Sequence, residues 1–350
     1  MKQFAVVFAG QGAQKPGMGL SLYEASPAAR AVFDLAGDEV KRDCFEADAE
    51  RLKETEVTQP AVYTMDVAAY CALCEGVKGF VPCAVAGFSL GEYAAFAAAG
   101  VFGPLMDGGF ETGLALVRTR SRLMKEAGRY ADGSPRGAMA AGMGAPEAVL
   151  ALVERARAGE VLEAVNFNSP QQTVVAGDAA AVERFAAMAK EDRSLGVKAI
   201  PLAVSGAFHS PIMAPAGEGL AAALEGYAFR APEVAVYVNV TGSGLLDSAA
   251  AAAGGLAQND NAIGGKPTQS GDVSALVKDV MVRQIQSPVQ WQRTIENIVA
   301  AGAEIIIEVG PGKTLTGLTK KIAPHVVALH VEDAETLAEV MDYWKGDRHE

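Results

Sequence analysis

The fold is decided by the stretch Val85-Ala86-Gly87-Phe88-Ser89-Leu90-Gly91-Glu92-Tyr93. A short apolar run enters a Gly-x-Ser-x-Gly turn, and an alanine-rich segment leaves it. This is the pattern of a nucleophile elbow, where a sharp strand-to-helix turn exposes a serine hydroxyl. Glycine permits the tight turn, and the helix that follows points its first amide N–H groups toward the serine. We therefore predict Ser89 as the nucleophile, and an ordinary turn of small residues remains the alternative.

Composition and patterning around the elbow indicate the fold class. The chain has 350 residues, of which 50% are hydrophobic and 21% charged, so it can bury a large core. Short apolar runs alternate with longer helical patterns, which is typical of an α/β protein with a largely parallel sheet. The expected strands are 4–9, 83–87, 235–240 and 304–309, and the expected helices are 59–75, 90–99, 109–127, 272–284, 288–301 and 333–343.

A different pattern occupies residues 133–203. It reads strand, helix, strand, strand, helix, strand, which is the order of a ferredoxin-like unit. The expected strands are 138–142, 161–167, 172–176 and 197–202, the helices are 146–157 and 178–191, and a turn is expected at Asn168-Ser169-Pro170. We therefore predict a small subdomain over 133–203, inserted into a large one formed by 1–132 and 204–350. A cleft between the two would be the default binding site.

One segment of the large subdomain lacks periodicity. Residues 243–272 are rich in Ala, Gly, Asn and Ser, and we predict a surface insertion there.

Charge and hydropathy exclude several classes of partner. Lys and Arg number 30 against 42 Asp and Glu, a formal charge of −12, which argues against a nucleic-acid footprint. The apolar run at residues 1–10 is too short for a signal peptide and lacks an Ala-x-Ala site. No segment approaches the length of a membrane span. We expect a cytoplasmic protein without a membrane or nucleic-acid partner, and a monomer because no long exposed apolar stripe is evident.

The four cysteines follow no disulfide or zinc spacing. Cys71 and Cys74 fall inside a helical pattern without a second ligand pair, and Cys44 and Cys83 stand alone. We predict reduced thiols in the core and no metal site.

A serine nucleophile needs a base, because its neutral hydroxyl is a weak nucleophile. His325, His330 and His349 lie near the C-terminus, whereas His209 follows the last expected strand of the small subdomain. A loop there could return the imidazole to the cleft. We predict His209 as the base. The alternative is a capping or surface histidine before a helix at 212–225.

Five motifs in order then resemble those of the bacterial, stand-alone malonyl-CoA:acyl carrier protein transacylases, across essentially the whole chain. They are Gly10-Gln11-Gly12-Ala13-Gln14, Gly87-Phe88-Ser89-Leu90-Gly91, Ala207-Phe208-His209-Ser210, Gln284 with Pro288-Val289-Gln290-Trp291, and Glu308-Val309-Gly310-Pro311-Gly312. The resemblance implies a hydrolase-like core with a parallel sheet and an inserted ferredoxin-like subdomain.

The resemblance also implies an activity. A malonyl group would pass from malonyl-CoA to the phosphopantetheine thiol of acyl carrier protein in fatty-acid biosynthesis, by a ping-pong mechanism through a malonyl-serine. The coenzyme A thioester is then a substrate, and no cofactor is permanently bound. Alternatives are a trans-acting acyltransferase of a polyketide pathway, a serine thioesterase or hydrolase that uses water, and a silent binding module.

Roles for individual residues come from the same resemblance. Ser89 would attack the thioester and His209 would carry the proton, while the backbone carbonyl of Gln284 would hold the second histidine nitrogen. The oxyanion would be bound by the backbone N–H groups of Gln11 and Leu90.

Arg120 aligns with the arginine that pairs with the free carboxylate of malonate, and Phe208 would crowd an α-methyl group on the acyl chain. Asn166 could hydrogen-bond substrate, although Asn166 and Asn168 are also suited to an Asx turn, the interpretation that we favour. Phe88 departs from the family, which usually has histidine at this position.

Overall fold

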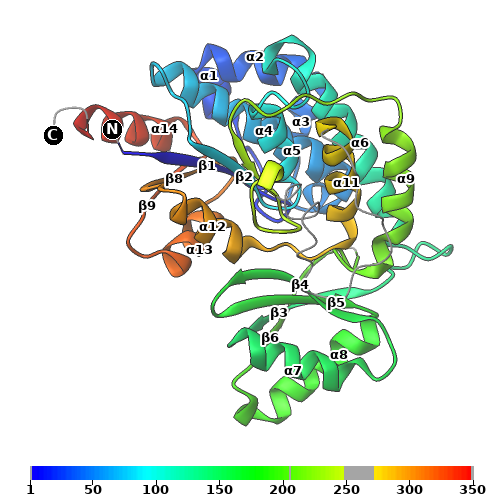
Figure 1. The fold of residues 1–350 in the computed structure, drawn as a ribbon. Coiled ribbons are helices and arrows are strands. Elements are labelled where there is room, and N and C mark those ends of the chain that lie inside the picture. The colour runs from blue at the N-terminus through cyan, green and yellow to red at the C-terminus, as the bar shows by residue number, and fades with distance from the viewer. Residues whose placement is uncertain (1, 205, 248–271, 348–350) are drawn as a thin grey trace.

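The computed structural model describes residues 2–204, 206–247 and 272–347 (Figure 1). Its larger sheet has five strands in the order β7-β2-β1-β8-β9, and every neighbouring pair is parallel. The strands are β1 (Phe4–Phe8), β2 (Ala84–Gly87), β7 (Ala235–Tyr237), β8 (Ile305–Val309) and β9 (Val327–Val331). The expectation of an α/β fold with a parallel sheet is thus confirmed.

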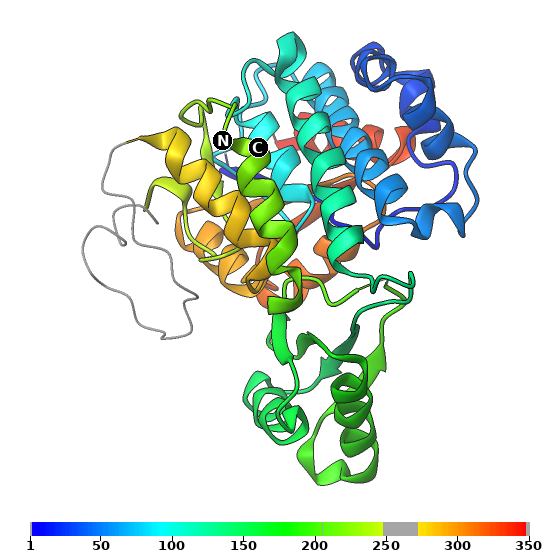
Figure 2. The same cartoon turned by 90° about the vertical axis from the view of Figure 1, so that its right-hand side faces the viewer.

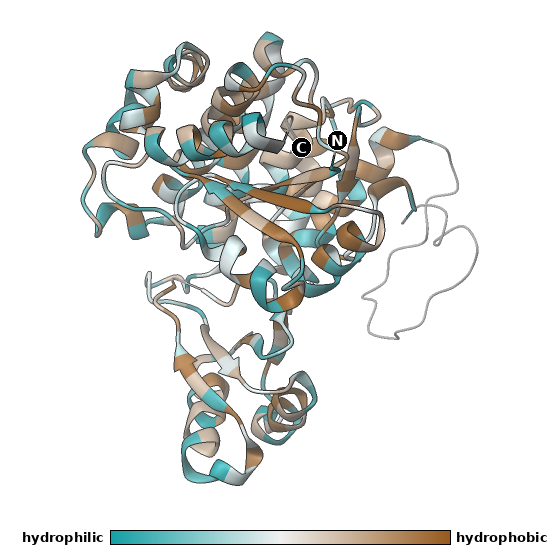
Figure 3. Ribbon diagram, turned by 90° about the vertical axis from the view of Figure 1, so that its left-hand side faces the viewer, coloured by the Kyte–Doolittle hydropathy of each residue, from teal (hydrophilic) through white to brown (hydrophobic). Residues whose placement is uncertain are grey.

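Helices cover both faces of this sheet, which explains why its central strands are almost entirely apolar, apart from Glu308 in β8. Every residue of β1, β2 and β8 is buried, and Figure 3 shows these strands largely in brown. Along β1, Val6 and Phe8 pack in one core cluster, whereas Ala5 and Val7 pack in another. This alternation follows from the two-residue period of a strand.

The first face is covered mainly by α4 (Thr55–Gly76), α5 (Gly91–Ala98) and α6 (Phe110–Ala127), and the second by α12 (Trp291–Ala300) and α13 (Thr314–Ile322). The remaining α-helices described in this part are α1 (Leu20–Ala25), α2 (Pro27–Ala36), α3 (Asp38–Phe45), α9 (Ala214–Leu224), α11 (Val273–Gln286) and α14 (Ala334–Asp347).

The second sheet is antiparallel and lies below the first in Figures 1 and 2. Its order is β4-β5-β3-β6, from β3 (Ala138–Met143), β4 (Leu162–Ser169), β5 (Gln172–Gly177) and β6 (Lys198–Pro201). The helices α7 (Pro146–Arg157) and α8 (Ala179–Glu191) cover one face around Val149, Leu152 and Phe185. Side chains on the other face, including Met139 and Val174, join the core of the larger part.

Some expected elements differ from the observed ones. The predicted turn at 168–170 is wrong, because β4 runs to Ser169, which pairs with Gln172, and the chain turns at 170–171. The helices α1 to α3 and α13 and the strand β9 had no predicted counterpart. Most of the predicted 243–272 insertion lies outside the described residues.

The cysteines are free, but the prediction that all are core thiols is wrong for Cys83. Cys44 and Cys71 are buried and Cys74 is partly buried, whereas Cys83 is exposed just before β2. Among the described residues no cluster of His, Cys, Asp or Glu is arranged to hold a metal ion. None of the described helices has the length and apolar character needed to cross a membrane.

Candidate active site

Ser89 lies on the sharp turn between β2 and α5, in the left-handed region with φ of 52°. The glycines on either side make that turn possible. A Cβ atom on Gly87 would lie 1.9 Å from the carbonyl carbon of Gly91, and one on Gly91 would lie 2.3 Å from the carbonyl oxygen of Phe8. The strained backbone at Ser89 is of the kind that folded proteins retain at functional sites.

His209 faces the serine from the loop that follows β6. Its Nε2 lies 2.7 Å from Ser89 Oγ, and its Nδ1 lies 2.8 Å from the backbone oxygen of Gln284. A carbonyl oxygen only accepts, so Nδ1 carries the hydrogen and Nε2 accepts from the serine hydroxyl. Burial, and then the positive charge of Arg120, lower the pKa of His209 to about 4. The imidazole is therefore neutral at pH 7, as a general base must be.

Arg120 projects from α6 into the same site with only 1% of its surface exposed. Its Nη2 donates to Ser89 Oγ and to Gln284 Oε1, both at 3.1 Å, and its guanidinium lies over the Tyr93 ring, 5.5 Å from the centroid. Within the described residues its Nε has no hydrogen-bond partner. A buried cation with an unused donor is well suited to bind a carboxylate.

Of the three arginines at positions 118, 120 and 122, only Arg120 is buried. Arg118 and Arg122 are exposed, and Arg122 pairs with Glu126 on the outer face of α6. Residues two apart point to different faces of a helix, which explains the difference.

Gln284, on α11, contacts all three of these residues. Its backbone oxygen holds His209, its Oε1 accepts from Arg120, and its Nε2 donates to the backbone oxygen of Ser89 at 2.6 Å. The sequence had suggested the backbone contact alone, and the side chain adds the other two.

Gln11 follows β1 and lies close to the elbow. A Cβ atom on Gly10 would lie 2.5 Å from the carbonyl oxygen of Phe88, so glycine permits the close approach of the two loops. In the part of the chain that the structure describes, no hydrogen bond occupies the amide N–H of Gln11 or of Leu90. Both donors are therefore free for a ligand oxygen.

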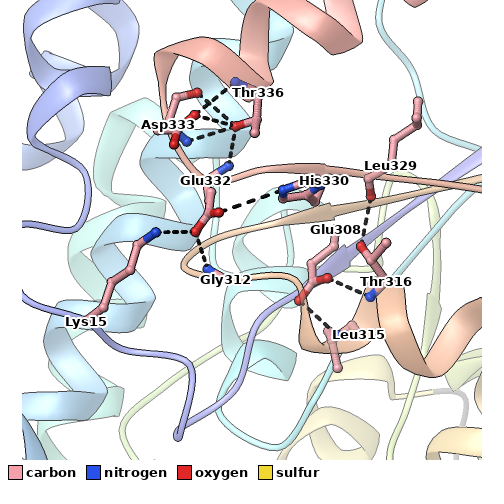
Figure 4. A network of polar contacts seen from close by, with 10 residues as sticks. All are labelled: Lys15, Glu308, Gly312, Leu315, Thr316, Leu329, His330, Glu332, Asp333 and Thr336. Carbon is pink, nitrogen blue, oxygen red and sulfur yellow. Dashed lines mark hydrogen bonds and ion pairs between the residues drawn. The ribbon is translucent and has the colours of Figure 1, made fainter.

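A network of polar contacts fixes the loop that carries Gln11 (Figure 4). Lys15, near the end of this loop, pairs with Glu332, which also accepts the Gly312 N–H at 2.9 Å. The buried Glu308 accepts the N–H groups of Leu315 and Thr316 at the start of α13. The strand β8 is thereby bound to α13, and Glu332 links Gly312, after β8, to the loop after β1.

Asn166 and Phe208, the two other predicted substrate contacts, are both buried. Asn166 lies within β4, 8% exposed, and its Oδ1 has no partner in the described structure. The favoured Asx turn is therefore wrong for Asn166 and Asn168, since both belong to the strand. Phe208 is 7% exposed and precedes His209, while the Phe88 ring packs edge-on against Trp291 at 5.4 Å.

Two residues of the site were missed from the sequence. Asn239 Oδ1 accepts the Ser89 N–H at 2.7 Å, and the fully buried Glu92 accepts the Asn239 N–H at 2.5 Å. Asn239 follows β7, next to β2, at the carboxyl edge of a parallel sheet where ligands commonly bind. The position of Asn239 at that edge was the sequence signal that could have identified it as a residue of the site.

Comparison with known proteins gives consistent results. Residues 5–338 match the family model described as acyl transferase domain. The malonyl CoA-acyl carrier protein transacylase of Haemophilus influenzae is 38% identical over 98% of this chain and 99% of its own, and that of Escherichia coli K12 is 37% identical over 98% and 100%.

Solved structures agree with these relatives. A malonyl CoA-acyl carrier protein transacylase from Clostridium perfringens superposes with a TM-score of 0.81 at 30% identity, covering 99% of this chain and 98% of that one. A malonyl-transacylase in complex with a type II polyketide acyl-carrier protein has a TM-score of 0.80 at 34% identity, covering 98% and 100%.

Proposed function

Because the chain belongs to the malonyl CoA-acyl carrier protein transacylases of the acyl transferase family, we propose that it moves a malonyl group from coenzyme A to an acyl carrier protein through an ester on Ser89. The observation that carries the proposal is the contact of Ser89 Oγ with both His209 Nε2 at 2.7 Å and Arg120 Nη2 at 3.1 Å. A base and a carboxylate-binding cation thus meet at one hydroxyl.

In the first half-reaction, Ser89 Oγ attacks the thioester carbonyl carbon as His209 Nε2 takes the hydroxyl proton. The oxyanion that forms accepts hydrogen bonds from the amide N–H groups of Gln11 and Leu90. When the C–S bond breaks, His209 returns its proton to the leaving sulfur of coenzyme A. The malonyl group remains as an ester on Ser89, and the imidazole is again neutral.

The second half-reaction reverses these steps with a new thiol. His209 takes the proton of the phosphopantetheine thiol, the sulfur attacks the ester carbonyl, and Ser89 Oγ leaves with the proton from His209. The Gln284 carbonyl keeps the same histidine tautomer in both directions, because it accepts from Nδ1 throughout.

Arg120 supplies the selectivity for malonyl. Its guanidinium would bind the free carboxylate of the acyl group and so align the thioester with Ser89. Acetyl groups lack that carboxylate and would leave a buried cation unpaired. Phe208 and Asn166 would line the acyl pocket, in a cleft between the proposed small subdomain at 133–203 and the rest of the chain.

We assign the transfer to fatty-acid synthesis, with a polyketide carrier as the second candidate because the similar solved complex holds a polyketide acyl-carrier protein. The proposal includes a cytoplasmic monomer that needs no bound cofactor. Light scattering in solution would measure the oligomeric state directly.

The deciding experiment is intact-protein mass spectrometry after brief incubation with malonyl-CoA. Acetyl-CoA and Ser89→Ala serve as controls, followed by addition of a pantetheinylated carrier from each pathway. We expect a malonyl adduct that requires Ser89 and moves to the fatty-acid carrier faster than to the polyketide carrier. An adduct lost to water at the same rate without a carrier would instead indicate a hydrolase.

A further inference from the structure

Asn239 lies beside the elbow and is hydrogen-bonded to Ser89. It lies two residues past β7, is 1% exposed, and uses all of its polar groups within the protein. Its side-chain Oδ1 accepts the Ser89 N–H at 2.7 Å, and its Nδ2 donates to the Gly87 oxygen at 2.6 Å. One amide side chain therefore bridges the two peptide groups on either side of Phe88.

This bridge acts on a backbone that is otherwise strained. Ser89 has φ of 52°, a conformation that non-glycine residues rarely adopt. Such a conformation persists only when its surroundings hold it. On the other side of Ser89, Gln284 Nε2 donates to the serine backbone oxygen at 2.6 Å. Both main-chain polar groups of the nucleophile are thus held by side chains, one from each neighbouring segment.

Asn239 is itself fixed on both sides. Its own N–H donates to Glu92 Oε2 at 2.5 Å, and its carbonyl accepts the Gln290 N–H at 2.8 Å. Glu92 is fully buried on the first turn of α5, three residues past the nucleophile. The helix that begins at the elbow therefore supports the residue that holds the elbow.

The bridge also decides which amides can serve the reaction. Because the Ser89 N–H is bound to Asn239, it cannot donate to an oxyanion. The next amide, that of Leu90, has no acceptor among the described residues and is free to do so. Asn239 thus turns one N–H group away from the substrate and leaves the other available.

We propose that Asn239 is a positioning residue, which holds the Ser89 backbone so that Oγ meets His209 and the Leu90 N–H faces the oxyanion. The inference rests on the proposed function, because it assumes that Ser89 is acylated. Asn239 touches neither substrate nor the reacting atoms, and so its loss should slow acylation without weakening the binding of malonyl-CoA.

The test compares Asn239→Asp with Asn297→Asp in the full chain. Aspartate keeps the shape and one acceptor, but it places a second acceptor against the Gly87 oxygen, where Nδ2 now donates. Asn297, on α12, is the matched control. Its Nδ2 donates to the oxygen of Gly242, which lies in the segment after β7 with Asn239, but it does not contact the elbow. Adduct formation from malonyl-CoA is followed by rapid quench and intact mass.

For Asn239→Asp we expect kcat for acylation to fall about 10²-fold, as for a misplaced nucleophile, with KM changed less than about threefold. Asn297→Asp should keep kcat within about threefold. Equal losses in both variants, or a loss confined to KM, would overturn the positioning role. A wild-type protein that forms no adduct would instead overturn the proposed function, and the positioning role with it.

Hydrogen exchange in the wild-type protein gives a test that does not depend on folding of the variant. Side-chain amide protons exchange fast unless they are hydrogen-bonded, so the Asn239 Nδ2 protons report its contact with Gly87 directly. We expect exchange slowed by about 10³-fold or more relative to a free asparagine side chain. Unprotected exchange at Asn239 in folded, active protein would refute the bridge.

Discussion

The two sheets of this molecule contribute different residues to the candidate site. In the parallel sheet, Gln11, Ser89 and Asn239 each follow a strand at its carboxyl end, after β1, β2 and β7. The antiparallel sheet holds the buried Asn166 and Asn168 on β4, leads into the loop with His209 after β6, and packs apolar side chains against the larger part. Parallel strands that end at one edge gather loops and helix N-termini, whereas antiparallel strands disperse theirs to both edges. We therefore assign the proposed nucleophile and oxyanion donors to the first sheet, and enclosure of the site to the second.

A short segment joins the two sheets. Val289 donates its N–H to the Val165 oxygen at 2.8 Å and accepts the Phe167 N–H at 2.9 Å, so it extends the edge of β4. The next residue, Gln290, donates to the Asn239 oxygen. The antiparallel sheet is thus hydrogen-bonded, through two residues, to the segment that holds the nucleophile.

The largest effects should come from the parallel-sheet side. Ser89→Ala removes the attacking oxygen, and we expect the rate of acyl transfer to fall by about 10⁴-fold or more while the fold is kept. Loss of the adduct in intact mass, with an unchanged thermal midpoint, is the measurement. An adduct of normal yield on Ser89→Ala would show that another residue is the nucleophile. It would also contradict the assignment of the nucleophile to the parallel sheet.

The second largest effect should come from removal of Arg120, the proposed partner of the malonyl carboxylate. Arg120→Ala should reduce the preference for malonyl-CoA over acetyl-CoA by about 10²-fold or more, because the unpaired cation that rejects acetyl is gone. Arg120→Lys keeps the charge without the planar fork and should recover only part of the preference. The ratio of kcat/KM for the two thioesters measures both. Unchanged discrimination in Arg120→Ala would contradict the assignment of this residue to malonate.

The burial of His209 should also determine how the rate of acylation depends on pH. The pKa of His209 is lowered from 6.5 to about 4 by burial and by Arg120, so the neutral base persists well below neutral pH. We expect kcat/KM for acylation to stay level down to about pH 5 and to halve near pH 4. Proton uptake by the unfolded chain begins near 6.5, and the contribution of His209 to stability is therefore lost as the pH falls from there through about 4.

Arg120→Ala offers a matched comparison for this profile. Without the guanidinium, the pKa of His209 should rise toward its ordinary value, and the acid limb should move with it. An acid limb already at 6.5 in the wild-type protein would show that the imidazole is solvated in solution.

The parts of the site that the sequence could predict share a physical reason. The elbow is a local feature, since two glycines and a serine specify the turn within five residues. Ser89 and His209 are also the two site residues in the left-handed region, with φ of 52° and 62°. The apolar runs of the parallel sheet could also be predicted, because strands buried on both faces are mostly apolar, with Glu308 of β8 as an exception.

The parts that could not be predicted depend on contacts between distant segments. Asn239 reaches Ser89 across 150 positions in the sequence, and nothing in its local pattern distinguishes it from a turn asparagine. The strand β9 has four partly exposed residues out of five, so its apolar pattern is weak. The turn after β4 was misplaced because pairing with β5, and not the local Asn-Ser-Pro sequence, sets the end of that strand.

The smallest effect should come from the antiparallel sheet, at Asn166. Its buried Oδ1 has no partner within the described residues, and a substrate hydrogen bond would satisfy it. Asn166→Ala should raise KM for malonyl-CoA by about tenfold or less, the worth of one neutral hydrogen bond, and should leave kcat within about threefold. Steady-state kinetics, with Asn168→Ala in the same strand as control, separate the two constants. A fall in kcat near that of Arg120→Ala would make β4 part of the chemistry, and the antiparallel sheet would then be more than an enclosing wall.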